Sequence, residues 1–453
     1  MAESTGRLVM VSNRLGRAVA PGGLALVLSE ALRTTGGMWF GWDGEAGDGP
    51  SGHARTMRIA DGVEHVGMTL SDADRAGYYD GYSNAVLWPA CHGQSGLMQY
   101  READYRAYQR VNLQFARALL GRLRPHDSVW VHDFHLIPLA AALRSLGALQ
   151  PIGFFLHTPF PTPRSLRRIP EHRSLLAQLK AYDRIGVQTQ RDRAALAQCG
   201  VDPGRVFVAG VTIDVVKAGR LARSRAANVA VKHYLPEAPD RGLILGGDRA
   251  DYSKGLDVRL LAVEQLLEGR PDLHRRFELL QICAPTRTGV AHYGDLPPRL
   301  RFTAQRINRR FGSKDWQPVR LVFEALPRDI ALGLMHHADV GLVTPRRDGM
   351  NLVAMEFITA QCRRSPGVLV LSREAGIAER LGEAIRVNPH PPDIADGLER
   401  ALAMNAAQRQ LRHVASLASL SDHTPSAWVR QLSAALREAA DPATERRAVA
   451  SAS

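Results

Sequence analysis

Two basic side chains lie five residues apart in the segment Gly246–Gly255, which reads G-G-D-R-A-D-Y-S-K-G. Arg249 and Lys254 flank a turn that follows an apolar run, so both can reach one anion. Arginine offers a planar fork of donors and lysine a compact point charge. Each charge-assisted hydrogen bond is worth on the order of 1.5–3 kcal/mol, and a leaving diphosphate gains charge as its bond breaks. The pair predicts a diphosphate site, with two solvated surface cations as the alternative.

A second candidate anion site is the segment Val340–Glu356, V-G-L-V-T-P-R-R-D-G-M-N-L-V-A-M-E. Its pattern predicts a buried strand, a turn at Pro345, Asp348 and Gly349, and then a helix. The start of a helix presents unpaired backbone N–H groups and the positive end of the helix dipole. Asp348 and Asn351 add polar groups for sugar hydroxyls. The segment suits a nucleotide-sugar diphosphate, although it also fits an ordinary strand–turn–helix unit of a core.

Polar residues also follow apolar runs in the first half of the chain. Arg14 follows the first run, and Gly22 and Gly23 then permit close approach of the backbone to a ligand, or simply form a turn. Asp133 in W-V-H-D-F-H is a candidate acceptor for sugar hydroxyls. His157 in F-F-L-H-T-P-F-P ends another run, where a buried structural histidine is the alternative.

The sequence predicts neither a metal nor a cofactor. His132 and His135 have no carboxylate or third histidine at metal-ligand spacing. The four cysteines are scattered, which predicts free thiols in a reducing cytoplasm. Leu8–Val11 is too short for a signal peptide, and no apolar run approaches the roughly 18 residues of a membrane span. We therefore expect a cytoplasmic protein with no membrane partner.

The formal charge of +13 fits anionic small molecules better than nucleic acid. Arginines are spread along the whole chain, and no block of like charge with interleaved aromatic residues is present. The expected partners are small-molecule substrates without nucleic acid. The oligomeric state is left open, a homo-oligomer included.

Short continuous apolar runs separated by helical segments predict an α/β protein with parallel sheets covered on both faces. Eleven runs exceed one comfortable sheet, and 453 residues exceed one ordinary core, so we expect two Rossmann-like domains. Ligands in such folds bind at the carboxyl ends of the strands. The expected divisions are 1–235, 236–412, a helix at 413–440 and a disordered tail at 441–453, with a linker near 227–241. The runs are Leu8–Val11, Val129–Val131, Ile152–Leu156, Ile185–Gln188, Val206–Val208, Leu243–Leu245, Leu279–Ile282, Leu321–Phe323, Val340–Val343, Val368–Leu371 and Ile385–Val387.

Taken together, the motifs resemble those of the trehalose-phosphate synthase family of retaining glycosyltransferases. The resemblance runs from about Leu8 to about Trp428 and keeps the family's order and approximate spacing. The motifs are S-N-R, G-G-L-A, W-F-G-W, Y-Y-x-x-Y-S-N-A-V-L-W-P, H-D-F-H-L, G-F-F-L-H-T-P-F-P, D-R-x-D-Y-S-K-G-L, R-I-N and D-G-M-N-L-V-A-x-E.

This resemblance implies the GT-B fold, in which two Rossmann-like domains face each other across a cleft and a C-terminal helix crosses back to the first domain. It implies glucosyl transfer from a nucleotide diphosphate glucose, UDP-glucose in first place, to glucose 6-phosphate, as part of trehalose biosynthesis and osmoprotection. The family works without a metal by front-face attack, in which the leaving phosphate oxygen helps accept the proton of the attacking hydroxyl. The absence of an evident carboxylate pair of the glycosidase type agrees with that mechanism.

The resemblance also implies a role for each matching residue. Arg14 and Arg306 would clamp the phosphate of the acceptor, while His157 would touch the donor sugar near the reaction centre. The implied catalytic residues are His157, Arg249, Lys254 and Asp348. The implied acceptor-binding residues are Arg14, Tyr79, Trp88, Asp133 and Arg306. The implied donor-binding residues are Gly22, Gly23, Arg249, Lys254, Leu326, Asp348, Gly349, Met350, Asn351, Leu352, Val353 and Glu356.

The chain departs from the family pattern near the nucleotide base. Met355 stands where a lysine or tyrosine is common, and Leu326 where an aromatic residue often borders the base. The loop between Arg14 and Gly22 is shorter than in well-known bacterial members. The choice among uracil, guanine and adenine therefore stays open. The alternatives are a glucosylglycerol-phosphate synthase that uses glycerol 3-phosphate and a non-catalytic sugar-phosphate sensor.

Overall fold

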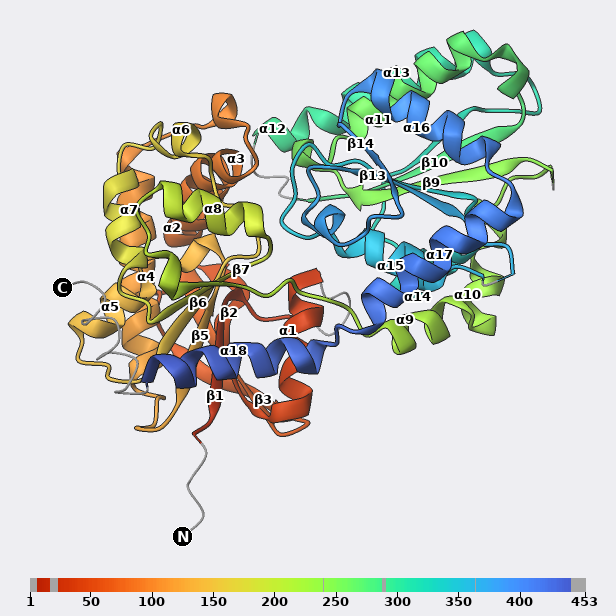
Figure 1. Cartoon of the computed structure of the whole chain (residues 1–453). Helices are drawn as coiled ribbons and strands as arrows, with labels where there is room; N and C mark the ends of the chain where they lie inside the picture. The colour runs from red at the N-terminus through yellow and green to blue at the C-terminus, as the bar shows by residue number, and fades with distance from the viewer. Residues whose placement is uncertain (1–5, 17–22, 239, 287–290, 363, 441–453) are drawn as a thin grey trace. The chain divides into compact units, whose positions relative to one another are not determined.

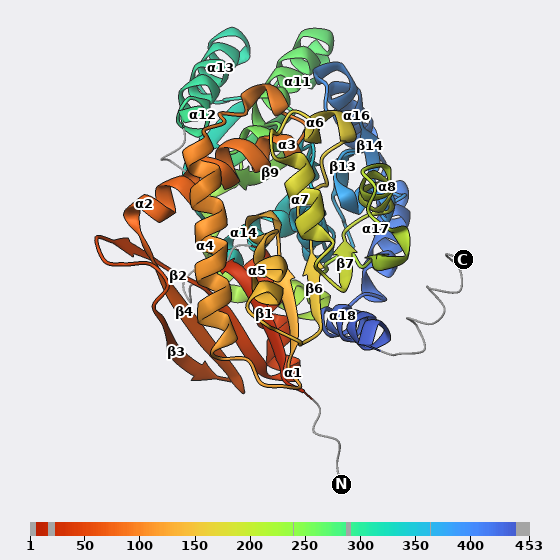
Figure 2. The ribbon, with the colours of Figure 1, turned by 90° about the vertical axis from the view of Figure 1, so that its left-hand side faces the viewer.

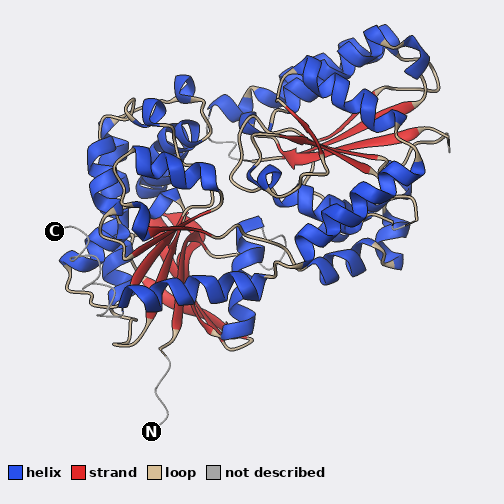
Figure 3. Ribbon diagram, viewed as in Figure 1, coloured by secondary structure: helices blue, strands red, loops and turns tan. Residues whose placement is uncertain are grey.

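The computed structural model describes residues 6–16, 23–238, 240–286, 291–362 and 364–440. The chain divides into two compact units. Unit 1 contains the described residues up to Val211 and those from Pro425 onward, and unit 2 contains Thr212–Thr424. Each unit is built on a largely parallel sheet with helices on both of its faces (Figure 1, Figure 3). The expected α/β class with two Rossmann-like domains is thereby confirmed.

The sheet of unit 1 has the order β3-β4-β2-β1-β5-β6-β7-β8, and each of its neighbouring pairs is parallel except β3 with β4. The strand order reverses between β1 and β5, and such a switch point is where open α/β sheets bind ligands. The strands are β1 (Leu8–Arg14), β2 (Gly37–Gly47), β3 (Ala54–Ala60), β4 (Val63–Ser71), β5 (Ser128–His132), β6 (Ile152–Phe155), β7 (Arg184–Val187) and β8 (Val206–Val208).

Helices cover both faces of this sheet, because right-handed crossovers on the two sides of the switch point place their helices on opposite faces. The C-terminal helix α18 returns to unit 1 and lies beside α1 (Figure 1). The helical segments are α1 (Gly23–Thr35), α2 (Asp72–Asp74), the π-helical η1 (Arg75–Leu87), α3 (Trp88–Cys91), α4 (Glu102–Leu120), α5 (Leu139–Ser145), α6 (Pro163–Leu166), α7 (His172–Leu179), α8 (Gln190–Gln198) and α18 (Pro425–Ala440).

All eleven apolar runs form strands, but the sequence reasoning missed β2, β3 and β4. Strand β3 forms the edge of the sheet and is largely exposed, so it lacks the continuous apolar run used to find the others (Figure 2). A usable signal was present at Asp61-Gly62, where φ is 52° and 73°. Two positive φ values in a two-residue connection are typical of the type I′ hairpin turn, which Asp-Gly favours.

The sheet of unit 2 is parallel throughout and has the order β11-β10-β9-β12-β13-β14. Counted from its first strand this is 3-2-1-4-5-6, the order of dinucleotide-binding folds, with the switch point between β9 and β12. Continuous burial of β12 and β13 reflects helices on both faces. The strands are β9 (Gly242–Arg249), β10 (Phe277–Ala284), β11 (Val319–Val322), β12 (Val340–Val343), β13 (Val368–Ser372) and β14 (Ile385–Val387).

The helices of unit 2 form two groups that pack among themselves. One group contains α11, α13 and α16, and the other contains α9, α10, α14, α15 and α17. The helices are α9 (Val215–Ala222), α10 (Arg225–Ala230), α11 (Leu256–Gly269), α12 (Ala291–Gly294), α13 (Leu296–Phe311), α14 (Arg328–His337), α15 (Leu352–Ala360), α16 (Pro391–Ala403) and α17 (Ala406–Ser421).

The units divide at places that differ from the expected boundaries at 235/236 and 412/413. Helices α9 and α10 pack on α14, and Ala227 is fully buried, so this part of the expected linker belongs to the core of unit 2. Helix α17 packs on α15, and only α18, from Pro425, returns to unit 1. The expected disordered tail at 441–453 lies outside the described residues. Among the described helices, none is both long and apolar enough to cross a lipid bilayer.

Candidate active site

The turn after β9 is shaped so that Lys254 meets Asp348. The Asp251 carboxylate accepts a hydrogen bond from Ser253 N (2.9 Å), which closes the turn. Gly255 has φ +68°, and a Cβ there would lie 2.5 Å from the carbonyl oxygen of Thr344, so the turn lies against the end of β12. The Lys254 Nζ lies 2.5 Å from Asp348 Oδ2, and the lysine is only 8% exposed. The structure therefore joins the two candidate anion sites of the sequence into one.

The carboxylate of Asp348 organises the turn between β12 and α15. Its Oδ1 accepts a hydrogen bond from Gly349 N (3.0 Å), and its Oδ2 accepts one from Asn351 Nδ2 (2.9 Å). The Asp348 backbone N–H donates to Glu374 O (3.0 Å), which ties the turn to the segment after β13. One cation and two N–H donors therefore fix the orientation of this carboxylate.

Asn351 caps the helix that begins at this turn. It has φ +77°, and its side-chain oxygen accepts a hydrogen bond from Ala354 N (3.1 Å). The next two residues, Leu352 and Val353, begin α15, where the first backbone N–H groups have no partner within the helix. A non-glycine residue at positive φ stores strain and often marks a functional site. The helix start beside Lys254 can accept an anionic group.

Arg259 on α11 lies beneath this site and was not found from the sequence. It is completely buried and its Nη2 lies 2.6 Å from Asp248 Oδ2 and 3.2 Å from Lys254 O. Its other donors reach Thr344 Oγ1 (3.1 Å) and Gln281 Oε1 (3.2 Å). One guanidinium therefore connects β9, β10 and the residue after β12 with the loop that carries Lys254. Its only sequence signal is a charge directly before the apolar run Leu260–Val263.

The other residues predicted to bind the donor have different surroundings. Arg249 is the last residue of β9 and is exposed. Leu326 is partly exposed and immediately precedes Pro327, which caps α14. Glu356 on α15 pairs with Arg328 (Nε to Oε1, 3.1 Å). This ion pair holds the carboxylate that the resemblance assigns to the ribose.

The two methionines of this segment point into the core. Met350 is 3% exposed, and Ile377 N donates to its carbonyl oxygen (2.9 Å). Met355 is completely buried. A side chain packed in the core of its own unit offers no surface to a nucleotide base, so any effect of Met355 on the choice of base would be indirect.

In unit 1, Arg14 at the end of β1 is held by aromatic and backbone contacts. Its guanidinium lies 5.0 Å from the ring centroid of Trp42, and its Nη2 donates to Gly44 O (3.1 Å). Gly44 has φ +92°, a conformation that favours glycine, and a Cβ there would lie 2.4 Å from the guanidinium in its present position. The Tyr79 ring, on η1, lies 5.8 Å from Trp42 and stacks on His135 at 5.9 Å. These contacts bring Arg14 and Tyr79 against the same indole.

Asp133 follows β5 in a strained conformation, with φ +77°. Its backbone N–H donates to Phe155 O (2.8 Å), and its Oδ1 accepts a hydrogen bond from His157 N (3.2 Å). Asp133 is therefore fixed beside the end of β6, and its binding of an acceptor hydroxyl stays a prediction. Trp88 differs, because it is only 5% exposed and packs against His92 and Phe134. Little of its ring is left for a sugar.

His157 follows β6 and shares a hydrogen bond with His132, the last residue of β5 (Nε2 to Nδ1, 3.0 Å). Burial, reinforced by His132, lowers the pKa of His157 well below its ordinary value. Burial alone lowers the pKa of His132 to about 3. Both rings are neutral at pH 7. His157 is therefore a buried, hydrogen-bonded histidine, and this does not exclude a position near the reaction centre.

These histidines should make the protein less stable in mild acid. Between about pH 3 and pH 6.5 the unfolded chain binds more protons than the folded one, so stability is fully present above about pH 6.5 and is lost as the pH falls. A pKa of about 3 for His132 corresponds to about 2 kcal/mol lost between pH 7 and pH 5. His132→Gln should flatten this dependence in urea unfolding at the two pH values. The exposed His126→Gln is the matched control, and an equal slope in both variants would contradict the prediction.

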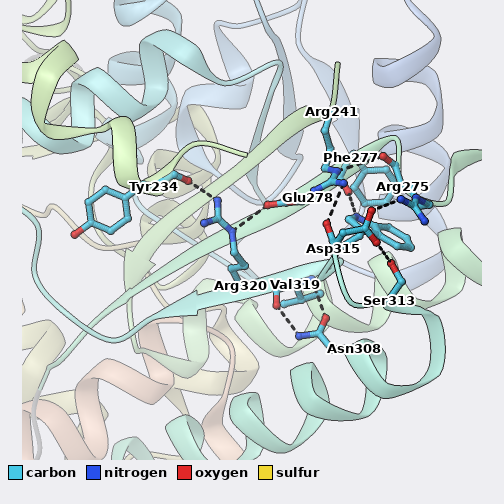
Figure 4. Close-up of polar contacts among 11 residues, drawn as sticks. Tyr234, Arg241, Arg275, Phe277, Glu278, Asn308, Ser313, Asp315, Val319 and Arg320 are labelled. Carbon is cyan, nitrogen blue, oxygen red and sulfur yellow. Dashed lines mark hydrogen bonds and ion pairs between the residues drawn. The ribbon is translucent and has the colours of Figure 1, made fainter. Parts of the chain in front are cut away.

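Within unit 2, Arg306 lies apart from Lys254 and Asp348. Its guanidinium is bound by both carboxylate oxygens of Glu264 on α11. Two residues later, the Asn308 amide pairs with the backbone of Val319, the first residue of β11 (2.8 and 3.0 Å). Figure 4 shows this pair beside Arg320 and Arg241, which both bind the buried Glu278. Arg306 thus lies near the amino ends of the strands, whereas Lys254 and Asp348 follow their carboxyl ends.

Two further predictions concern a glycine pair and a metal. Gly23 is exposed and begins α1, whereas Gly22 lies outside the described residues. Within the part of the chain that the structure describes, no group of three or more His, Cys, Asp or Glu side chains could hold a metal ion. Sequence reasoning assigned no site role to four residues that the structure places there. Arg259 lies beneath Lys254 in unit 2, and the His157 ring in unit 1 is contacted by His132, Gln188 and Trp428.

Solved structures show the same architecture. A crystal structure of an α,α-trehalose-phosphate synthase (UDP-forming) from Burkholderia vietnamiensis matches with a TM-score of 0.92 and 39% identity, covering 97% of this chain and 100% of that one. A second, from Burkholderia xenovorans in complex with glucose 6-phosphate, matches with a TM-score of 0.91 and 38% identity, covering 95% and 100%. The fold, with cations at the switch point of unit 2, is that of a GT-B glycosyltransferase.

The family follows from the sequence comparison. Residues 12–438 match glycosyltransferase family 20, and the chain belongs to this family. A trehalose-6-phosphate synthase from Klebsiella pneumoniae is 38% identical over 446 residues, which is 93% of each chain. The resemblance inferred from the motifs is confirmed, and the chain is a glycosyltransferase.

Proposed function

We propose that this protein transfers glucose from UDP-glucose to glucose 6-phosphate and forms α,α-trehalose 6-phosphate with retention of configuration. The observation that carries the proposal is the Lys254–Asp348 pair at the start of α15, at the switch point of unit 2. It provides a buried cation, backbone N–H groups and sugar-binding polar groups in one place. The UDP-forming relatives and the relative in complex with glucose 6-phosphate support the choice of substrates.

In this proposal unit 2 stabilises the leaving group. Lys254, Arg249 and the N–H groups of Leu352 and Val353 bind the diphosphate of the sugar donor, and Asp348 and Asn351 bind its glucose. As the bond from the anomeric carbon to the phosphate oxygen breaks, its electron pair stays on the UDP diphosphate. Cations already in place stabilise that growing charge without reorganisation. Glu356, held by Arg328, binds the ribose, while Leu326 and Gly349 contribute to the same pocket.

Unit 1 would bind the acceptor. Arg14 holds its phosphate, and Tyr79 and Asp133 hold hydroxyl groups. The anomeric hydroxyl of glucose 6-phosphate attacks the anomeric carbon of the donor from the face on which the diphosphate leaves. Its proton passes to the departing phosphate oxygen, so the reaction needs no carboxylate pair and no metal. Arg306 is left out of the proposed set because of its position.

The test is a matrix of UDP-, GDP- and ADP-glucose, each offered with glucose 6-phosphate and with glycerol 3-phosphate. We expect nucleotide release and a disaccharide phosphate with UDP-glucose and glucose 6-phosphate, at an unchanged rate in EDTA. Turnover with glycerol 3-phosphate alone would make the protein a glucosylglycerol-phosphate synthase. Binding without turnover of any pair would make it a sugar-phosphate sensor.

We further propose that the protein acts in the cytoplasm on small molecules alone. Its four cysteines, Cys91, Cys199, Cys283 and Cys362, are free thiols, which suits a reducing compartment. The scattered arginines supply a positive field for two phosphorylated substrates rather than a nucleic-acid or membrane surface. Fractionation of cells and light scattering of the purified protein test the location and the oligomeric state.

A further inference from the structure

The His157 ring, which the resemblance places against the donor sugar, is enclosed by three side chains to which the resemblance assigns no role. His132 lies at the end of β5, Gln188 directly follows β7, and Trp428 comes from α18. His132, Gln188 and Trp428 are 0%, 4% and 2% exposed. Residues distant in sequence therefore converge on one imidazole.

The hydrogen bonds fix which nitrogen of His157 carries the proton. Val211 N donates to Gln188 Oε1 (2.9 Å), so the amide must turn its NH₂ group the other way. That group lies 3.4 Å from His157 Nδ1, which accepts from it. The proton of the neutral ring is then on Nε2, which donates to His132 Nδ1 (3.0 Å). His132 in turn carries its own proton on Nε2, a buried atom with no hydrogen-bond partner among the described residues.

Trp428 encloses the same group of rings from the returning helix. Its indole N–H donates to Ala209 O (3.0 Å). Its ring centroid lies 5.1 Å from Phe155, 6.1 Å from His132 and 6.2 Å from His157. Ala209 and Val211 are the last residues of unit 1 before the chain enters unit 2, and Trp428 comes three residues after its return at Pro425. The His157 ring is thus held by both segments that lead the chain out of and back into unit 1.

We propose that Gln188 is a positioning residue that fixes the tautomer and orientation of His157, with Trp428 holding the far side of the ring group. The inference rests on the proposed function and deepens it. Both ring nitrogens of His157 are used within the protein, so the imidazole exchanges no proton with substrate. The ring instead provides a rigid surface, and the backbone N–H of His157 donates to the Asp133 carboxylate.

The charged and titratable groups facing the ring allow a sharp test. His132, at the end of β5, contacts the ring, and the carboxylate of the next residue, Asp133, contacts the His157 backbone. The other two contacts are with uncharged side chains, Gln188 after β7 and the indole of Trp428 on α18. Gln188→Glu places a carboxylate 3.4 Å from Nδ1, where an amide donor stood. A carboxylate favours a proton on Nδ1 and raises the pKa of a neighbouring imidazole. The variant should therefore give His157 a titration that the parent protein lacks.

The experiment compares Gln188→Glu and Gln188→Met with Gln178→Glu on α7. Gln178 hydrogen-bonds Gln109 and has no hydrogen bond to His157, which makes it a matched control. Long-range ¹H–¹⁵N spectra of ¹⁵N-histidine-labelled protein report the tautomer, and pH profiles of kcat report the titration. We expect an Nε2–H tautomer in the parent and the control, an Nδ1 proton with a new inflection near neutral pH in Gln188→Glu, and a kcat about 10- to 100-fold lower in Gln188→Met. UDP affinity, measured by calorimetry, should stay within about twofold, since its proposed ligands lie in unit 2.

An Nδ1–H tautomer in the parent protein, or a flat pH profile in Gln188→Glu with normal kcat in Gln188→Met, would overturn the inference. If the parent protein turns over no substrate pair, the proposed function fails instead. The tautomer measurement still stands in that case, because it needs no substrate. Loss of UDP affinity in a Gln188 variant would show a general folding defect, and the assignment to positioning would then be rejected.

Discussion

Replacing Lys254 with alanine should lower kcat by about 100- to 1000-fold while leaving the protein folded. Lys254 is a buried cation beside the start of α15, and its Nζ lies 2.5 Å from the Asp348 carboxylate. Loss of one pre-placed donor to a developing anion costs a factor of this size in enzymes that stabilise one. The effect should fall on kcat more than on KM, because the charge of the diphosphate grows as the bond breaks.

Two variants separate this role from a structural one. Lys254→Arg keeps the charge but exchanges a compact ammonium for a broad fork, and should recover only part of the rate. Lys314→Ala removes an exposed lysine elsewhere in unit 2 and should leave the rate unchanged. Steady-state kinetics with UDP-glucose and glucose 6-phosphate measures all three. A Lys254→Ala rate within a few-fold of the parent protein would remove Lys254 from the proposed mechanism.

Replacing Arg259 with methionine should destabilise unit 2 by about 3–5 kcal/mol. Breaking a buried ion pair by removing one partner leaves the other charge without compensation in the core. Here that partner is Asp248, which lies 2.6 Å away and whose side chain is 4% exposed, and the backbone carbonyl of Lys254 loses a donor as well. Activity should fall together with stability, since the loop that carries Lys254 loses its anchor.

Unfolding of unit 2 can be followed separately. Trp316 is the only tryptophan between residues 212 and 424, and its buried indole donates to Phe277 O (2.8 Å). Urea titration followed by ¹⁹F NMR of fluorotryptophan-labelled protein therefore reports on this unit. Arg299→Met, on the exposed surface of α13, should shift the unfolding free energy by less than about 0.5 kcal/mol. The double variant Arg259→Met/Asp248→Asn should recover part of the loss, and equal stability of the single variant and its parent would refute the buried-pair argument.

The sequence predicted the strands that are buried on both faces and missed those that are not. Val340–Val343 and Val368–Ser372 are continuous apolar segments because helices cover them from both sides. Strand β3, with Met57 and Ile59 exposed, carries no such signal. The Asp61-Gly62 turn was the sign that a hairpin was present.

The candidate site shows the same division. Lys254 and Asp348 follow the carboxyl ends of β9 and β12, and strand direction alone brings such positions to one edge of a parallel sheet. Arg306 matched a motif by sequence, but it lies near the end of a helix that leads to the amino end of β11. Position along an element decided which of these residues can act together.

By itself, the sequence determined the fold class, the family and the residues at the ends of the parallel strands. These three properties follow from local patterns of hydrophobicity, turns and motifs, each of which depends only on residues close together in the sequence. Only the tertiary structure decided that Lys254 pairs with Asp348, that Arg259 joins β9, β10 and the residue after β12, and that Gln188 and Trp428 hold His157. Such contacts join residues up to about 270 positions apart in the sequence. Buried polar groups need hydrogen-bond partners, and the fold decides which distant residues supply them.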